Sequence, residues 1–199
     1  MSFKDNFGNP QGFIGKLMLI GMNHGHGPMA KWAFTQFEVP LSGKIVDVGC
    51  GGGYNLKRLL KASKDAMVCG VDISEVCVKK SESVNKAELN KRLRVYLASA
   101  DKLPFKDNEI DLVTAFETVY FWKDLDKCFK EINRVLKVGG KFAIINDPGD
   151  PNKHWDEMIP DMTNWKAEEL MAYMLENNFK DVKITKDKYK YCVIATKKS

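Results

Sequence analysis

The stretch KIVDVGCGGGYNLKRLL, residues 44–60, joins a strand pattern, a glycine-rich loop and a helix pattern. The β-branched run at residues 44–48 predicts a strand, and the apolar spacing from residue 54 onward predicts a helix. The glycines between them permit positive φ angles and remove the Cβ atoms that would hold a ligand off the backbone. Because open α/β sheets bind ligands at the carboxyl ends of their strands, we expect a ligand site at this loop.

The rest of the chain alternates between the same two patterns. Further strands are predicted at residues 66–72, 93–99, 109–116 and 141–147, and further helices at residues 74–89, 124–138 and 164–178. A turn is expected at Gly139 and Gly140, directly after the helix at residues 124–138. The alternation predicts an α/β fold with a mostly parallel sheet and helices on both faces. Two alternating runs at residues 181–187 and 189–196 predict a final antiparallel hairpin.

Composition narrows the class of protein. With 199 residues and 44% hydrophobic content, the chain is expected to form a single domain. The 31 basic and 26 acidic side chains are spread along the whole length, which favours a mixed solvated surface over a polyphosphate-binding stripe. The 5 cysteines have an odd count and no CxxC spacing, as expected of reduced thiols. The early apolar stretch at residues 12–22 is too short to span a bilayer, so we expect a soluble, cytoplasmic protein.

The details of the glycine loop distinguish between nucleotide ligands. The dinucleotide fingerprint starting at Gly49 would require glycine at position 54, where Tyr54 stands, and no Lys-Ser or Lys-Thr pair completes a P-loop. Asp47 beside the loop would repel a pyrophosphate but attract an ammonium group. A nucleoside with an amino group and no phosphate therefore fits the loop best.

Several ordered motifs carry a family resemblance. They are VDVGCGGGY at residues 46–54, CGVDIS at residues 69–74, LASADKLPFKDNEIDLVTAF at residues 97–116, and EINRVLKVGGKFAII at residues 131–145. Together they resemble the class I S-adenosylmethionine-dependent methyltransferases, with a methyltransferase type 11-like domain. The resemblance implies S-adenosyl-L-methionine as the cofactor. It also implies a Rossmann-like open sheet of about seven strands, mostly parallel with the last strand antiparallel.

Matching positions in these motifs define an expected cofactor site. The resemblance implies that Gly49 and Gly51 approach the methionine moiety, that Asp47 helps to hold its amino end, and that Asp72 binds the ribose. Ser99 stands where relatives often have an aspartate that accepts from the adenine amino group, so charge assistance is missing there, and Asp101 is either a solvated loop acid or a shifted contact. The full expected set is Asp47, Gly49, Cys50, Gly51, Asp72, Ile73, Ser99, Ala100, Asp101 and Phe116.

Candidates for catalysis and acceptor binding lie in three further segments. The run FETVYFW, residues 116–122, contains Glu117, which could act as a base, orient an amine, or simply be exposed. The run GMNHGHGPMAKW, residues 21–32, has the glycine hinges of a lid. The run DPGDPNKHW, residues 147–155, stands where the resembling family places substrate-recognition insertions. The candidate catalytic residues are Glu117, His24 and His26, and the candidate acceptor-pocket residues are Trp32, Tyr120, Trp122 and His154. No metal site is expected, since the chain has only 3 histidines and no further clustered ligands.

These inferences predict one methyltransferase domain over residues 1–199. We expect an N-terminal helical lid at residues 1–40, a cofactor-binding core at residues 41–146, and a substrate-side segment with the terminal hairpin at residues 147–199. The expected activity is methyl transfer to an N, O or S nucleophile of a small molecule, because the Asn-Pro-Pro-aromatic tetrad of amino-directed nucleic-acid enzymes is absent. Three alternatives stay open: an RNA or protein methyltransferase, a non-catalytic S-adenosylmethionine-binding module, and an NAD-dependent oxidoreductase.

Overall fold

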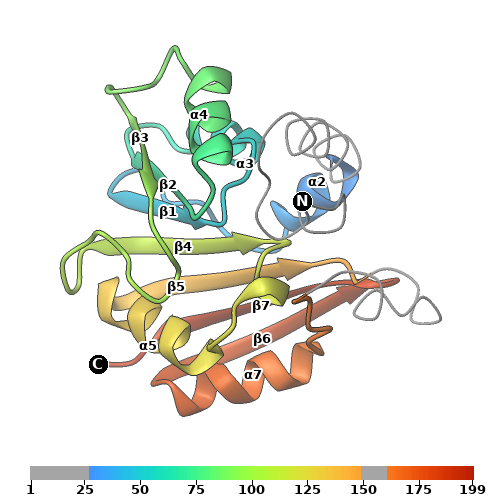
Figure 1. Ribbon diagram of the computed structural model, residues 1–199. Coiled ribbons are helices and arrows are strands. Elements are labelled where there is room, and N and C mark those ends of the chain that lie inside the picture. Colours follow the sequence, from blue (N-terminus) through green and yellow to red (C-terminus); the bar gives the residue numbers. More distant parts are fainter. Residues whose placement is uncertain (1–26, 149–160) are drawn as a thin grey trace.

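A computed structural model of the chain describes residues 27–148 and 161–199 (Figure 1). In these residues the strands are β1 (Lys44–Val48), β2 (Met67–Asp72), β3 (Leu93–Leu97), β4 (Ile110–Phe116), β5 (Leu136–Asn146), β6 (Phe179–Asp187) and β7 (Lys190–Lys197). The helices are α2 (Gly27–Ala33), α3 (Tyr54–Ala62), α4 (Glu75–Val84), α5 (Leu125–Val135) and α7 (Ala167–Glu176), with a short 3-10 helix η2 (Val119–Phe121).

The described strands form one 7-stranded sheet in the order β3-β2-β1-β4-β5-β7-β6. Strand β1 pairs in parallel with both β2 and β4, so the chain reverses direction of winding at this point. Strand β7 lies antiparallel between β5 and β6. The predicted fold, a mostly parallel open sheet with an antiparallel last strand, is confirmed. The reversal at β1 leaves a crevice beyond the carboxyl ends of β1, β2 and β4, where such sheets bind ligands.

Two apolar layers hold the helices against the sheet. Helices α5 and α7 pack on one face through residues such as Phe129 and Leu170, and α2 and α3 pack on the other through residues such as Ala33 and Leu56, with α4 on that same side (Figure 1). The central strands are buried on both sides, as expected of parallel strands covered by helices. No helix in residues 27–148 or 161–199 is long and apolar enough to cross a membrane.

The predicted boundaries of α4, α5 and α7 were wrong, and α7 spans Ala167–Glu176 instead of residues 164–178. Helix α5 ends at Val135, and residues 137–140 then form an irregularity within β5, because Ile110 pairs with Leu136 while Leu112 pairs with Lys141. The glycine pair thus sits in a bulge of a strand that has already begun, and not in a turn that precedes it. Helix α4 ends at Val84, where the Asn85 side chain binds carbonyl oxygens and replaces the next helical turn.

Candidate functional site

The glycine loop follows β1 and is tied to the end of β2. The backbone N–H groups of Gly49 and Cys50 donate to the carbonyl of Val71 at 2.7 and 3.0 Å. Gly49 has φ +74°, and a Cβ there would lie 2.6 Å from the Cβ of Thr118, so glycine permits the loop after β4 to approach. Gly51 has φ +52° and would place a Cβ in open space. The loop therefore presents bare backbone to the crevice.

Polar side chains from β2 and α4 fix the conformation of this loop. The Asp72 carboxylate accepts from the N–H of Gly51 at 2.8 Å and from the N–H of Ser74 at 2.9 Å. Ser81 donates its hydroxyl to the Gly51 carbonyl at 2.9 Å, and Asn85 donates its amide to the Gly53 carbonyl, also at 2.9 Å. Sequence reasoning did not identify Ser81 and Asn85. Their signal is a pair of polar residues four positions apart, one on the inward face of α4 and one directly after its last residue.

A cavity of about 310 Å³ opens beside the loop. Nine residues that the sequence singled out line it, and the carboxyl ends of four strands bring them together: Gly49, Gly51, Asp72, Ile73, Ser99, Ala100, Asp101, Glu117 and Trp122. Thr118 and Phe121 also line it and belong to the run at residues 116–122, although they were not named as single candidates. The other lining residues were not predicted: Val48, Cys77, Ala98, Lys123, Asp124 and Cys128. Most of them come from the β4–α5 connection and from the inward faces of α4 and α5, where a pattern of core residues gives no separate signal.

Five other candidates in the described residues do not line this cavity. The Cys50 thiol lies 3.5 Å from the Ser81 hydroxyl behind the loop, and Asp47 is only 1% exposed. Phe116 stacks on Phe34 at a centroid distance of 5.6 Å, on the α2 side of the sheet. Trp32 lies under the Lys190 ammonium, 5.2 Å from its ring centroid. Tyr120 is buried and reaches the site through Glu117.

The remaining candidates, His24, His26 and His154, lie outside the described residues. Their predicted roles stay predictions, as does the division of the chain into lid, core and substrate-side segment. In the part of the chain that the structure describes, no three His, Cys, Asp or Glu side chains are grouped so that they could hold a metal ion.

Asp47 is a buried acid directly beneath the loop. Its Oδ1 accepts from the Thr114 hydroxyl at 2.7 Å. Burial raises the pKa of this carboxyl from 3.8 to about 7, the Thr114 hydrogen bond opposes the shift, and the nearby Asp72 charge adds to it. The folded protein therefore holds a proton at Asp47 between pH 3.8 and about 7 that the unfolded chain releases. Stability contributed by this group falls as the pH rises through that window.

We expect the Asp47→Asn variant to be more stable than the wild type above pH 7. Asparagine keeps an oxygen for the Thr114 hydroxyl but carries no charge to bury. At pH 8, without cofactor, its melting temperature should exceed that of the wild type by roughly 3 °C or more, and the difference should shrink toward pH 5. Thermal unfolding at both pH values tests this. Equal melting temperatures at pH 8 would show that ionisation of the buried Asp47 does not destabilise the folded protein.

Glu117 stands at the end of β4 in a strained conformation. Its φ of +55° is uncommon for a residue with a side chain, and such strain is concentrated at functional sites. The Tyr120 hydroxyl donates to Glu117 Oε1 at 2.7 Å, and the Asp147 N–H donates to the same oxygen and to the Tyr120 oxygen. Burial raises the pKa of Glu117 to about 8, although both hydrogen bonds lower it. The cavity thus holds a carboxyl that can exchange a proton near neutral pH.

The charges around the cavity agree with the expected cofactor. Three aspartates line it beside Glu117, whose raised pKa of about 8 keeps its carboxyl mostly neutral at pH 7, and Lys123 is the one basic residue among its described lining residues. The bare backbone at Gly51 leaves room for close approach of a ligand. An acidic cavity with one lysine suits an adenosyl group attached to an amino acid with a positively charged sulfur, and would repel a pyrophosphate. The residues present therefore fit S-adenosylmethionine.

Comparison with known families also identifies a methyltransferase domain. The model of a family described as "Methyltransferase domain" matches residues 46–144, which run from β1 through most of β5. The uncharacterized methyltransferase YdaC of Bacillus subtilis is 29% identical over 154 residues, covering 77% of this chain and 81% of YdaC. Cycloartenol-C-24-methyltransferase 1 of Oryza sativa is 36% identical over 123 residues, covering 59% of this chain and 36% of that protein. The chain thus matches only about a third of the plant enzyme's length.

Solved structures share the fold. A chain of the complex between the Haloferax volcanii Trm112 methyltransferase activator and the putative methyltransferase has a TM-score of 0.79 at 24% identity, covering 92% of this chain and 94% of that chain. Geranyl diphosphate C-methyltransferase from Streptomyces coelicolor, solved with S-adenosyl-L-homocysteine, has a TM-score of 0.74 at 17% identity, covering 96% of this chain and 88% of that chain. With the family match, these findings leave no support for the NAD-dependent alternative or for a non-catalytic module. The chain belongs to the class I S-adenosylmethionine-dependent methyltransferases, and S-adenosylmethionine is its cofactor.

Proposed function

We propose that this enzyme methylates a small molecule at a nucleophile that loses a proton, and that Glu117 accepts this proton. The observation that carries the proposal is Glu117, whose backbone is strained, whose side chain lines the cavity, and whose carboxyl is held by Tyr120 and the Asp147 backbone. When bound, S-adenosylmethionine supplies a methyl group activated by its positively charged sulfur. The protein's part is to align the acceptor and to remove its proton.

We assign each group of lining residues to one part of the cofactor. Asp72 binds the ribose, Ser99 and Ala100 face the adenine, and the backbone at Gly49 and Gly51 faces the methionine portion. Asp47 does not line the cavity, so we assign it an electrostatic effect on the amino group through the loop, and we assign Cys50 and Phe116 a packing role. These assignments place the reacting methyl group toward Glu117, at the end of the cavity formed by β4.

Two observations favour a small acceptor over RNA or protein. The lining acids would repel a phosphate backbone, and the cavity has a single lysine to oppose them. Relatives named for small acceptors, such as the plant sterol enzyme and geranyl diphosphate C-methyltransferase, share the sequence pattern or the fold. Which atom accepts the methyl group is left to experiment, with amines, phenols and thiols as the candidates.

Calorimetric titration with S-adenosylmethionine, S-adenosylhomocysteine and NAD is the first test. We expect micromolar dissociation constants for the first two, of order 10⁻⁶ M, and no heat of binding for NAD. Labelled methyl transfer to panels of small amines, phenols and thiols, run beside total RNA and protein, then tests the acceptor class. Transfer to RNA or protein alone would overturn the small-molecule assignment and leave the cofactor assignment intact.

A further inference from the structure

One wall of the cavity belongs to an irregular segment. Residues 98–109 connect β3 to β4 without a helix, and residues 98–101 line the cavity. The backbone polar groups of such a segment need partners from elsewhere in the protein. At its start, the Ala98 N–H donates to the Asp72 carbonyl at 3.0 Å. At the far side of the wall, the Lys102 N–H donates to the Ser99 carbonyl at 3.1 Å, closing a turn that leads to Leu103.

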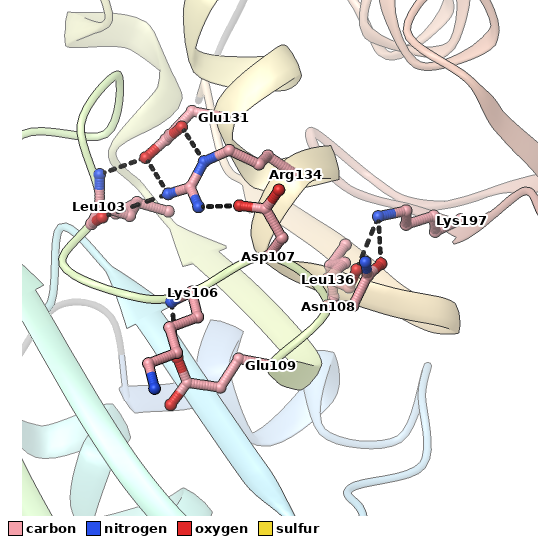
Figure 2. A network of polar contacts seen from close by, with 9 residues as sticks. All are labelled: Leu103, Lys106, Asp107, Asn108, Glu109, Glu131, Arg134, Leu136 and Lys197. Carbon is pink, nitrogen blue, oxygen red and sulfur yellow. Dashed lines mark hydrogen bonds and ion pairs between the residues drawn. The ribbon is translucent and has the colours of Figure 1, made fainter.

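Two charged side chains of α5 hold Leu103, the residue after this turn (Figure 2). Glu131 Oε1 accepts from the Leu103 N–H at 2.7 Å, and Arg134 Nη2 donates to the Leu103 carbonyl at 3.4 Å. Both backbone polar groups of Leu103 therefore end on the same pair of side chains. The Leu103 side chain is itself buried in the core, so the segment is fixed there from both sides.

Glu131 and Arg134 also fix each other. Arg134 donates to the two oxygens of Glu131 at 2.8 and 2.7 Å, and to Asp107 at 2.6 Å (Figure 2). This bidentate arrangement has a defined geometry and lowers the pKa of Glu131, which therefore stays ionised as an acceptor for Leu103. The Glu131 side chain is 15% exposed and that of Asp107 69%, so the inner pair is the ordered part of the network.

We propose that Glu131 and Arg134 are positioning residues for the cofactor: they hold the wall at residues 98–101 in place and so set the affinity for the adenosyl group. Helix α5 carries this pair on one turn and contributes Cys128 to the cavity on the previous turn, so one rigid element holds both. The inference rests on the proposed placement of adenine against Ser99 and Ala100. It adds two residues that do not line the cavity.

Glu131→Ala is the principal test. Its dissociation constant for S-adenosylhomocysteine, measured by calorimetry, should rise about tenfold, the equivalent of one lost hydrogen bond that organises the site. The constant for 5′-methylthioadenosine should rise by the same factor, because both ligands share the adenosyl group. With S-adenosylmethionine, KM should rise while kcat at saturation stays the same.

Two matched variants separate positioning from general destabilisation. Glu131→Gln keeps an oxygen for the Leu103 N–H and should bind S-adenosylhomocysteine within about threefold of the wild type. Lys130→Ala removes an exposed ion pair with Asp126 on the same helix, away from the loop, and should leave affinity unchanged. If the Glu131→Ala variant does not fold, amide hydrogen exchange of the Arg134→Lys variant is the alternative test. In that variant the amides of residues 99–103 should lose protection from exchange, while the amides of β4 should keep it.

Unchanged affinity in a folded Glu131→Ala variant with a lowered melting temperature would overturn the proposal, since the pair would then be structural only. Unchanged exchange in Arg134→Lys would overturn it in the same way. Asp72→Ala, titrated in parallel, separates this outcome from failure of the proposed function. If Asp72→Ala loses affinity and Glu131→Ala does not, only the positioning role is wrong, whereas normal affinity in both means that the cofactor is bound elsewhere.

Discussion

Replacing Asp72 by alanine should weaken binding of S-adenosylmethionine about a hundredfold, because hydrogen bonds to a charged group contribute about 1.5–3 kcal/mol each and 1.4 kcal/mol changes an equilibrium constant tenfold. The Asp72 carboxylate lines the cavity and already accepts from the N–H groups of Gly51 and Ser74. Its removal eliminates the ribose contact and also releases the Gly51 N–H, so that the loop loses a defined shape. Calorimetric titration of the purified variant measures the loss.

Asp72→Asn distinguishes these two effects. Asparagine keeps one oxygen for the Gly51 N–H but loses the charge and one acceptor, so an intermediate loss of about tenfold is expected. Asp65→Asn removes an exposed carboxylate from the turn before β2 and serves as the matched control, with affinity unchanged. An Asp72→Ala variant that is folded and binds the cofactor normally would show that the ribose is not held at the end of β2.

The sequence predicts those parts of the site whose position follows from a single short stretch of residues. Residues 44–60 specify a strand, a bare loop and a helix, and parallel strands place their carboxyl ends at one edge of the sheet. Asp72 is the last residue of β2, and Ser99 and Glu117 follow the ends of β3 and β4, so the three meet at the cavity although they are far apart in the chain. For these residues, position along a strand was sufficient.

Residues that act on distant backbone groups could not be predicted in this way. Ser81 and Asn85 bind carbonyls of a loop about 30 residues earlier, and Glu131 binds the N–H of Leu103, 28 residues earlier. A single sequence contains the donor and the acceptor but not their pairing. The orientation of Phe116 is a related case: β4 is apolar on both faces, so alternation does not tell which face its last residue joins.

We expect Glu117→Gln to lower kcat about a hundredfold or more while the affinity for S-adenosylmethionine stays within about twofold of the wild type. Glutamine preserves the size of the side chain and an oxygen for the Tyr120 hydroxyl and the Asp147 N–H, so the loop should keep its conformation. The glutamine side chain cannot take up the proton that the methylated nucleophile loses. Single-turnover rates with a methyl acceptor found by the panel screen separate this chemical step from binding.

The pH dependence gives the second readout. A base must be deprotonated, and the pKa of Glu117 is raised by burial to about 8, so wild-type kcat should increase with pH and level off above about pH 8. The Glu117→Gln variant should lack this rise. Tyr120→Phe removes a hydrogen bond that lowers the pKa of Glu117, so the rise of kcat in this variant should shift to higher pH. Tyr189→Phe alters an exposed phenol in the terminal hairpin and should leave the pH of this rise unchanged. A rise that persists unchanged in Glu117→Gln would assign the proton to another group, and a Glu117→Gln variant with wild-type kcat would show that the acceptor needs no base at this position.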